Sequence, residues 1–154
     1  MDTEQRPDDF SFRYEWREGS LPPPHYYEIT ISVSPRGEGV IVFCPDYTRH
    51  SAPVWQEHFR VPLPQLNELY QMMLERGVFA GRWETYPEES APVGGPLDWL
   101  EVIARGERHK APWLLRQPEA VKPLYEFIRA LVPETTWARL RSLHENFIAA
   151  YIDE

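Results

Sequence analysis

The sequence contains one cysteine, Cys44, among its 154 residues. A lone cysteine excludes an internal disulfide and a zinc site built from several thiolates, and it is typical of a reducing compartment. Residues 1–9 are acidic and polar, without the basic and apolar regions of a secretory signal. We therefore expect a cytoplasmic protein in which residues 1–9 form a disordered acidic tail.

Long apolar runs and positive charge are also scarce. Runs such as Val40–Cys44 are far shorter than the roughly 20 residues that a membrane-spanning helix needs. The formal net charge is −8, whereas affinity for a phosphate backbone comes mainly from cationic side chains. The sequence thus predicts neither a membrane nor a nucleic acid as partner.

Motifs for cofactors and metals are missing. The five histidines show no H-x-x-x-H pair that one helix face could present to a metal ion. The glycine pair in Val93–Asp98 has neither the G-x-G-x-x-G spacing nor the lysine of a phosphate-binding loop, and Pro96 removes one N–H donor. We expect no cofactor and no metal.

Proline and aromatic residues are abundant instead. The chain has 16 prolines and, from 6 Trp, 8 Tyr and 7 Phe, 21 aromatic side chains. Proline fixes φ and lacks an N–H, so stiff loops and sharply bounded elements are expected. Pro22–Pro24 stands between two alternating segments and is interpreted as a stiff connection. The alternative, a polyproline ligand for an aromatic groove, lacks the P-x-x-P spacing.

Alternation of apolar and polar residues predicts five or six strands. They fall at residues 10–17, 26–33, 40–44, 55–61, 97–104 and 109–115. The run at 40–44 is apolar throughout and predicts a strand covered on both faces. In 55–61, Glu57 interrupts the inward apolar pattern. Residues 97–104 could instead be helical, because short apolar runs are ambiguous.

Helical spacing of apolar residues predicts three helices, at residues 65–76, 119–131 and 136–151. Pro64 suits the first turn of the first helix, and Gly77 suits its carboxy-terminal cap. Thr135 or Thr136 can cap the last helix. The fold class predicted is α+β: residues 10–154 form one domain, a mainly antiparallel β-meander with the three helices packed on one face.

Two sets of residues are candidates for a functional site. Cys44 could act as a nucleophile if His50 or His58 served as its base. Trp83 and Tyr86 fall in a proline-rich and glycine-rich segment at 82–96, where aromatic side chains are candidates for contact with a partner.

The absence of a catalytic pattern predicts a non-catalytic, acidic binding or protein-interaction module. Its partner would be another protein, or a second copy bound through helix 136–151, whose apolar residues repeat at heptad-like spacing. The alternative is a small enzyme or small-molecule-binding protein with a cleft between the sheet and loop 82–96.

Overall fold

A six-stranded antiparallel sheet forms one layer of the protein, with strand order β4-β3-β2-β1-β5-β6. The computed structural model describes residues 4–18, 21–22, 24–45, 53–80, 97–114 and 122–152. The strands are β1 (Ser11–Arg17), β2 (Glu28–Val33), β3 (Glu38–Cys44), β4 (Trp55–Arg60), β5 (Leu97–Ala104) and β6 (Glu107–Leu114). The helices are α1 (Leu63–Glu75), a 3-10 turn η1 (Val78–Ala80), α2 (Lys122–Ala130) and α3 (Glu134–Ile152).

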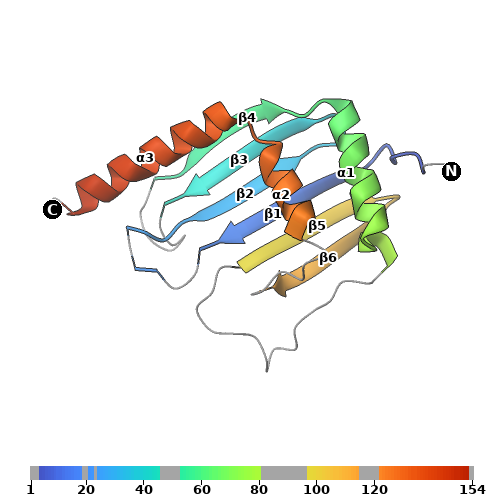
Figure 1. Ribbon diagram of the computed structural model, residues 1–154, viewed down its shortest axis with the longest axis horizontal. Coiled ribbons are helices and arrows are strands. Elements are labelled where there is room, and N and C mark those ends of the chain that lie inside the picture. Colours follow the sequence, from blue (N-terminus) through green and yellow to red (C-terminus); the bar gives the residue numbers. More distant parts are fainter. Residues whose placement is uncertain are drawn as a thin grey trace, which may run out of the picture.

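All three α-helices lie on the same face of the sheet, which confirms the predicted α+β class. Figure 1 shows α1 and α2 crossing the strands and α3 continuing past the ends of the strands. Ring contacts agree: Tyr70 of α1 packs on Phe10 and Tyr125 of α2 packs on Tyr14. The chain does not add strands in simple order, because β5 returns to pair with β1 instead of β4.

The helix ends differ from the sequence-based bounds for local reasons. α1 begins at Leu63 because Pro62 and Pro64 both fit a helix amino terminus, and Gly77 follows its end with φ 75°. The second helix was expected over 119–131; the structure describes α2 from Lys122 to Ala130, and residues 119–121 lie outside the described residues. α3 begins at Glu134, so Thr136 lies inside its first turn, and the predicted threonine cap is wrong.

The β5–β6 hairpin turns at two residues with positive φ, Arg105 at 55° and Gly106 at 75°. Both backbone N–H groups donate to the Asp9 carboxylate, at 2.8 Å and 2.7 Å. These bonds hold the pKa of Asp9 below its usual value, because they favour the charged carboxylate. Arg6 also donates to Asn67 of α1. Residues of the expected acidic tail therefore make specific contacts with two elements.

The core lies between the helices and one face of the sheet. On β1 the buried residues are Phe12 and Tyr14, and on β3 they are Gly39, Ile41 and Phe43. The other face of β3 carries Val40, Val42 and Cys44, which are only partly buried. The expectation that this strand is covered on both faces is therefore wrong for the described part of the chain.

Glu57 breaks the apolar pattern of β4 for a reason visible only in three dimensions. It points toward the helices with its neighbours Trp55 and Phe59 and accepts a hydrogen bond from Nε of Arg139 in α3, at 2.7 Å. The polar position on the inner side of β4 thus attaches α3 to the sheet edge.

Candidate functional site

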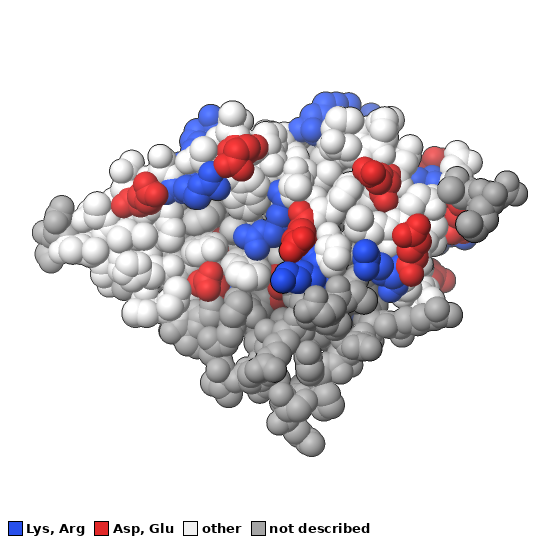
Figure 2. All heavy atoms as spheres, in the orientation of Figure 1, with Lys and Arg blue, Asp and Glu red and all other residues white. Residues whose placement is uncertain are grey.

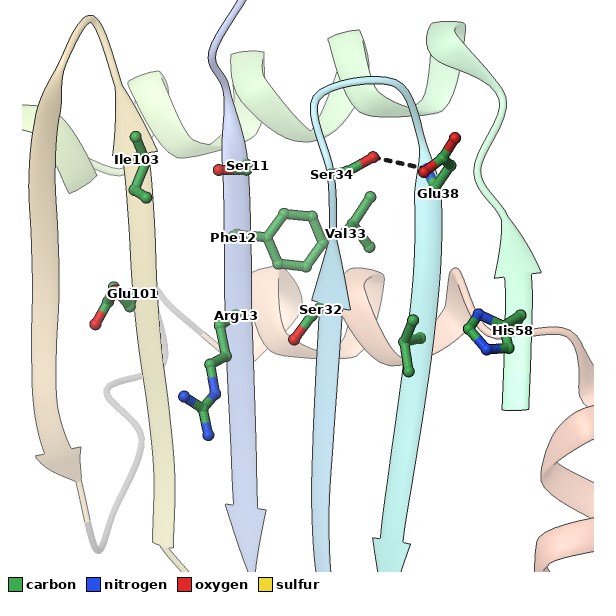
Figure 3. Close-up of a pocket in the computed structure, with 11 residues that line it drawn as sticks. Ser11, Phe12, Arg13, Ser32, Val33, Ser34, Glu38, His58, Glu101 and Ile103 are labelled. Carbon is green, nitrogen blue, oxygen red and sulfur yellow. Dashed lines mark hydrogen bonds between the residues drawn. The ribbon is translucent and has the colours of Figure 1, made fainter. Parts of the chain in front are cut away.

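The face of the sheet opposite the helices contains a hollow of about 470 Å³. Figure 3 shows side chains from neighbouring strands pointing into it. The polar residues that line it are Ser11, Arg13, Ser32, Ser34, Glu38, His58 and Glu101. The hollow exists because the serine side chains on the two central strands are short. Longer charged side chains border it.

The charges around this hollow pair with one another. Glu101 lies 3.3 Å from Arg108 and 3.8 Å from Lys110, and Arg13 lies 2.7 Å from Glu15. Ser32 and His58 sit on strands separated by β3, with Val40 opposite both. Two strand spacings are about 10 Å, so this serine and histidine cannot share a proton directly. The hollow offers polar contacts but no nucleophile with its base.

Cys44 and His58 lie on this same face but far apart. Val40 is the partner of His58 in the ladder, and Cys44 is four residues further along β3, a separation of about 13 Å. Burial, followed by the negative charge of Glu28, raises the pKa of the Cys44 thiol. The geometry therefore does not bring these two candidates together.

The remaining sequence candidates lie outside the described residues. They are His50, Trp83 and Tyr86, together with the whole of loop 82–96 and the cleft proposed beside it.

We expect alkylation of native Cys44 by iodoacetamide at pH 7 to be severalfold slower than alkylation of the same thiol in the urea-unfolded chain, because the folded thiol is less ionised. His58→Ala should leave the native rate unchanged. A fast native reaction that slows in His58→Ala would contradict this.

Sequence reasoning missed a buried polar cluster between the sheet and α2. Asp98 on β5 is 3% exposed and accepts a hydrogen bond from the Tyr14 hydroxyl on β1. The ring of Tyr125 from α2 packs against Tyr14, 5.4 Å between centroids. Asp98 alternates with Leu100 and Val102 on the inner face of β5, so an acidic residue within that apolar series was the available signal. Glu101 lies on the opposite face, where it lines the hollow described above.

Both tyrosines of this cluster are held as neutral phenols. Burial raises the pKa of Tyr14 and of Tyr125 well above the usual value, and the nearby Asp98 charge raises both further. The Tyr125 hydroxyl is buried and has no hydrogen-bond partner among the residues that the structure describes. Asp98 and Tyr14 therefore form a polar link in the core, whereas the Tyr125 hydroxyl contributes no bond.

Removing the two hydroxyls separately tests this assignment. Tyr14→Phe should lower the free energy of unfolding by about 1–3 kcal/mol, because a buried carboxylate loses a donor. Tyr125→Phe should change it by less than about 0.5 kcal/mol or raise it, because a buried hydroxyl without a partner is removed. Urea unfolding measures both, and equal losses in the two variants would refute it.

A third cluster joins α3 to the sheet through aromatic rings. His144 of α3 packs against the rings of Tyr27 and Phe43, with centroid distances of 5.5 Å and 5.3 Å. Its Nε2 donates to the backbone carbonyl of Pro24 at 3.0 Å, because a carbonyl can only accept. Burial lowers the pKa of His144, although the bond to Pro24 opposes this shift. The folded protein therefore favours the neutral imidazole.

This arrangement makes stability depend on pH. Below the ordinary histidine pKa, about 6.5, the unfolded chain binds a proton at His144 more readily than the folded chain does. The stability contributed by neutral His144 is therefore complete above that value and declines as pH falls toward the lower folded pKa.

We expect urea unfolding at pH 7.5 and 5.5 to show a smaller loss of stability in His144→Gln than in the unmodified protein. His58→Gln, which alters an exposed histidine on the opposite face, is the control and should behave like the unmodified protein. Equal pH dependence in all three proteins would show that His144 does not contribute.

No protein-family model matches the sequence, and the search of curated proteins found no similar chain. Within the described ranges, no group of three or more histidine, cysteine, aspartate or glutamate side chains is arranged to hold a metal ion. Among the helices of those ranges, none combines the length and the apolar character needed to cross a membrane. The surfaces and side-chain clusters of this chain are therefore the remaining guide to its function.

Proposed function

We propose that this chain is a non-catalytic protein-interaction module that pairs with a second copy of itself through the end of α3. The observation that supports this most directly is the uneven burial of that helix. Its two buried residues, Thr136 and Leu140, both lie in the first half of its 19 residues. The second half, residues 142–152, is called the α3 arm below.

The α3 arm carries large apolar side chains that the sheet covers only in part. Phe147 packs on Trp55 at 6.4 Å and on Tyr151 at 6.3 Å between ring centroids. Tyr151 is 46% exposed and Ile152 is 65% exposed. In Figure 1 the arm extends past the ends of the strands, where the sheet no longer supports it. An aromatic series thus runs from the core outward and ends in solvent.

The composition of the arm favours a second copy as the partner. Glu145 is the only charged residue among 142–152. Electrostatic attraction between the arm and an oppositely charged protein would therefore be weak. An isolated helical segment of this length is marginally stable in water. Antiparallel pairing about a two-fold axis would place the apolar strip of one arm against the same strip of the second copy. Two-fold symmetry of this kind is the most common among soluble homo-oligomers.

The helix-bearing face as a whole supports a contact that depends on apolar area. Figure 2 shows lysine and arginine side chains on this face standing beside aspartate and glutamate, with no broad patch of one sign among the described residues. Mixed charges of this kind provide weak steering, so burial of the arm would supply most of the affinity.

Sedimentation equilibrium tests the proposal over protein concentrations from about 1 µM to 1 mM. We expect the mean mass to rise from monomer to dimer in this range. The double variant Tyr151→Asp with Ile152→Asp should weaken dimerisation by at least about tenfold, because it places charge in the contact. Both residues are exposed, so the folded monomer should be retained.

Asn146→Asp is the matched control, because it adds one negative charge to the opposite, exposed side of the same helix. It should dimerise as the unmodified chain does. A monomer at every concentration, or equal weakening in the control and in the double variant, would reject the α3 arm as the contact.

A further inference from the structure

A second feature of the helix layer is an arginine held by two tryptophans. Arg129 lies in the last turn of α2, and its guanidinium carbon is 4.8 Å from the ring centroid of Trp16 and 5.7 Å from that of Trp137. Trp137 is itself fixed, because its Nε1 donates to the backbone carbonyl of Arg129 at 3.0 Å. Cation–π contacts with the two rings restrict the position of the guanidinium group.

The N–H groups of this guanidinium have no partner in the described part of the chain. Arg139 donates to Glu57 and Arg141 pairs with Glu134, but no hydrogen bond or ion pair engages the side chain of Arg129. Contacts with ring faces use none of its five N–H donors. The side chain is half-buried, and its nitrogens are not among the fully buried polar atoms without a partner. Solvent therefore reaches these donors.

Arg129 lines a hollow of about 460 Å³ between the end of α2 and the start of α3. It is lined by Arg129, Ala130, Val132, Glu134, Trp137 and Arg141. Two guanidinium groups and one carboxylate give this hollow a local charge of +1, in a chain whose formal net charge is −8. At physiological ionic strength, interactions between exposed charges more than about 8 Å apart are largely screened. The charged groups that line the hollow therefore dominate its electrostatic potential.

A competing explanation is that Arg129 balances the buried Asp98. Both charges act on Tyr14: Asp98 raises its pKa and Arg129 lowers it. Asp98, however, accepts a hydrogen bond from the Tyr14 hydroxyl, whereas no hydrogen bond or ion pair between Asp98 and Arg129 is present in the described part of the chain. If Arg129 only balanced the charge of Asp98 from a distance, its N–H donors would remain unused. These donors form the planar fork with which arginine binds oxyanions such as carboxylate and phosphate.

We propose that Arg129, held by Trp16 and Trp137, binds the oxyanion group of a small aromatic or apolar ligand, a carboxylate or a phosphate monoester. The guanidinium would donate two parallel hydrogen bonds to the oxyanion. The Trp137 ring would form a wall for the apolar part of the ligand. Arg141 lies at the same hollow and can exchange its exposed pairing with Glu134 for the ligand. This site is separate from the α3 arm and does not depend on dimerisation.

The experiment titrates the full chain with phenyl phosphate, benzoate, inorganic phosphate and neutral benzyl alcohol. Indole N–H signals of Trp16 and Trp137, assigned through Trp→Phe variants, report binding by NMR, and calorimetry gives the dissociation constants. We expect saturable shifts of these two indoles with an aromatic oxyanion, weaker binding of inorganic phosphate and none of benzyl alcohol. The ratio between phenyl phosphate and benzoate identifies which oxyanion is preferred.

Arg129→Gln should weaken binding by about tenfold or more, because charge-assisted bonds are lost. Arg129→Lys should retain part of the affinity, because it keeps the charge without the fork. Arg13→Gln, which removes an arginine from the opposite face of the sheet, is the control and should bind normally. Thermal melts of each variant establish that it is folded.

Two results would overturn the proposal. One is the absence of saturable indole shifts with all the oxyanions. The other is equal binding by Arg129→Gln and the unmodified chain. If Arg129 instead serves only to balance Asp98, Arg129→Gln will be destabilised, Asp98→Asn will restore its stability, and neither change will involve a ligand.

Discussion

The six-stranded sheet buries one of its faces under helices, and the rest of the structure depends on this one-sided burial. Alternate residues of β1, β2, β3 and β5 enter the core, so large rings such as Phe12, Tyr14 and Phe43 fill the layer beneath the helices. Their neighbours on the other face are mostly serine, threonine and charged residues, with partly buried valines on β3 and the partly buried Trp99 and Ile103 on β5. A single apolar layer then requires every helix to pack on the same side.

One-sided burial also determines where polar groups matter. Glu57 and Asp98 are acidic residues at inner positions of strands, and each is joined to a donor from a distant part of the chain, Arg139 in one case and Tyr14 in the other. A buried carboxylate without a donor would be costly. These two bonds therefore select one arrangement: Glu57 attaches α3 to the sheet edge, and Asp98 links β5 to β1 beneath α2.

The two proposed surfaces arise where the helices leave this layer. α3 is 19 residues long and its buried residues lie in its first half, so its apolar strip continues beyond the sheet as the α3 arm. Arg129 lies where α2 ends and the chain turns into α3, and the indoles of Trp16 and Trp137 hold it there. The first surface depends on apolar area and the second on directed hydrogen bonds, so either can exist without the other. The hollow on the opposite face has charges that pair among themselves.

Local patterns account for most elements of this protein, because period-two and helical spacings connect residues that are near one another in the chain. Alternation predicted the strands observed as β1, β2 and β4, a continuous apolar run predicted β3, and the segment that forms β5 was also compatible with a helix. Which distant residues meet follows from the tertiary structure alone. Tyr14 and Asp98 are 84 positions apart, and Arg139 reaches Glu57 across 82. The pairing of β5 with β1 creates the first contact and the docking of α3 on β4 creates the second, and no local pattern encodes either, because both depend on how the whole apolar layer closes.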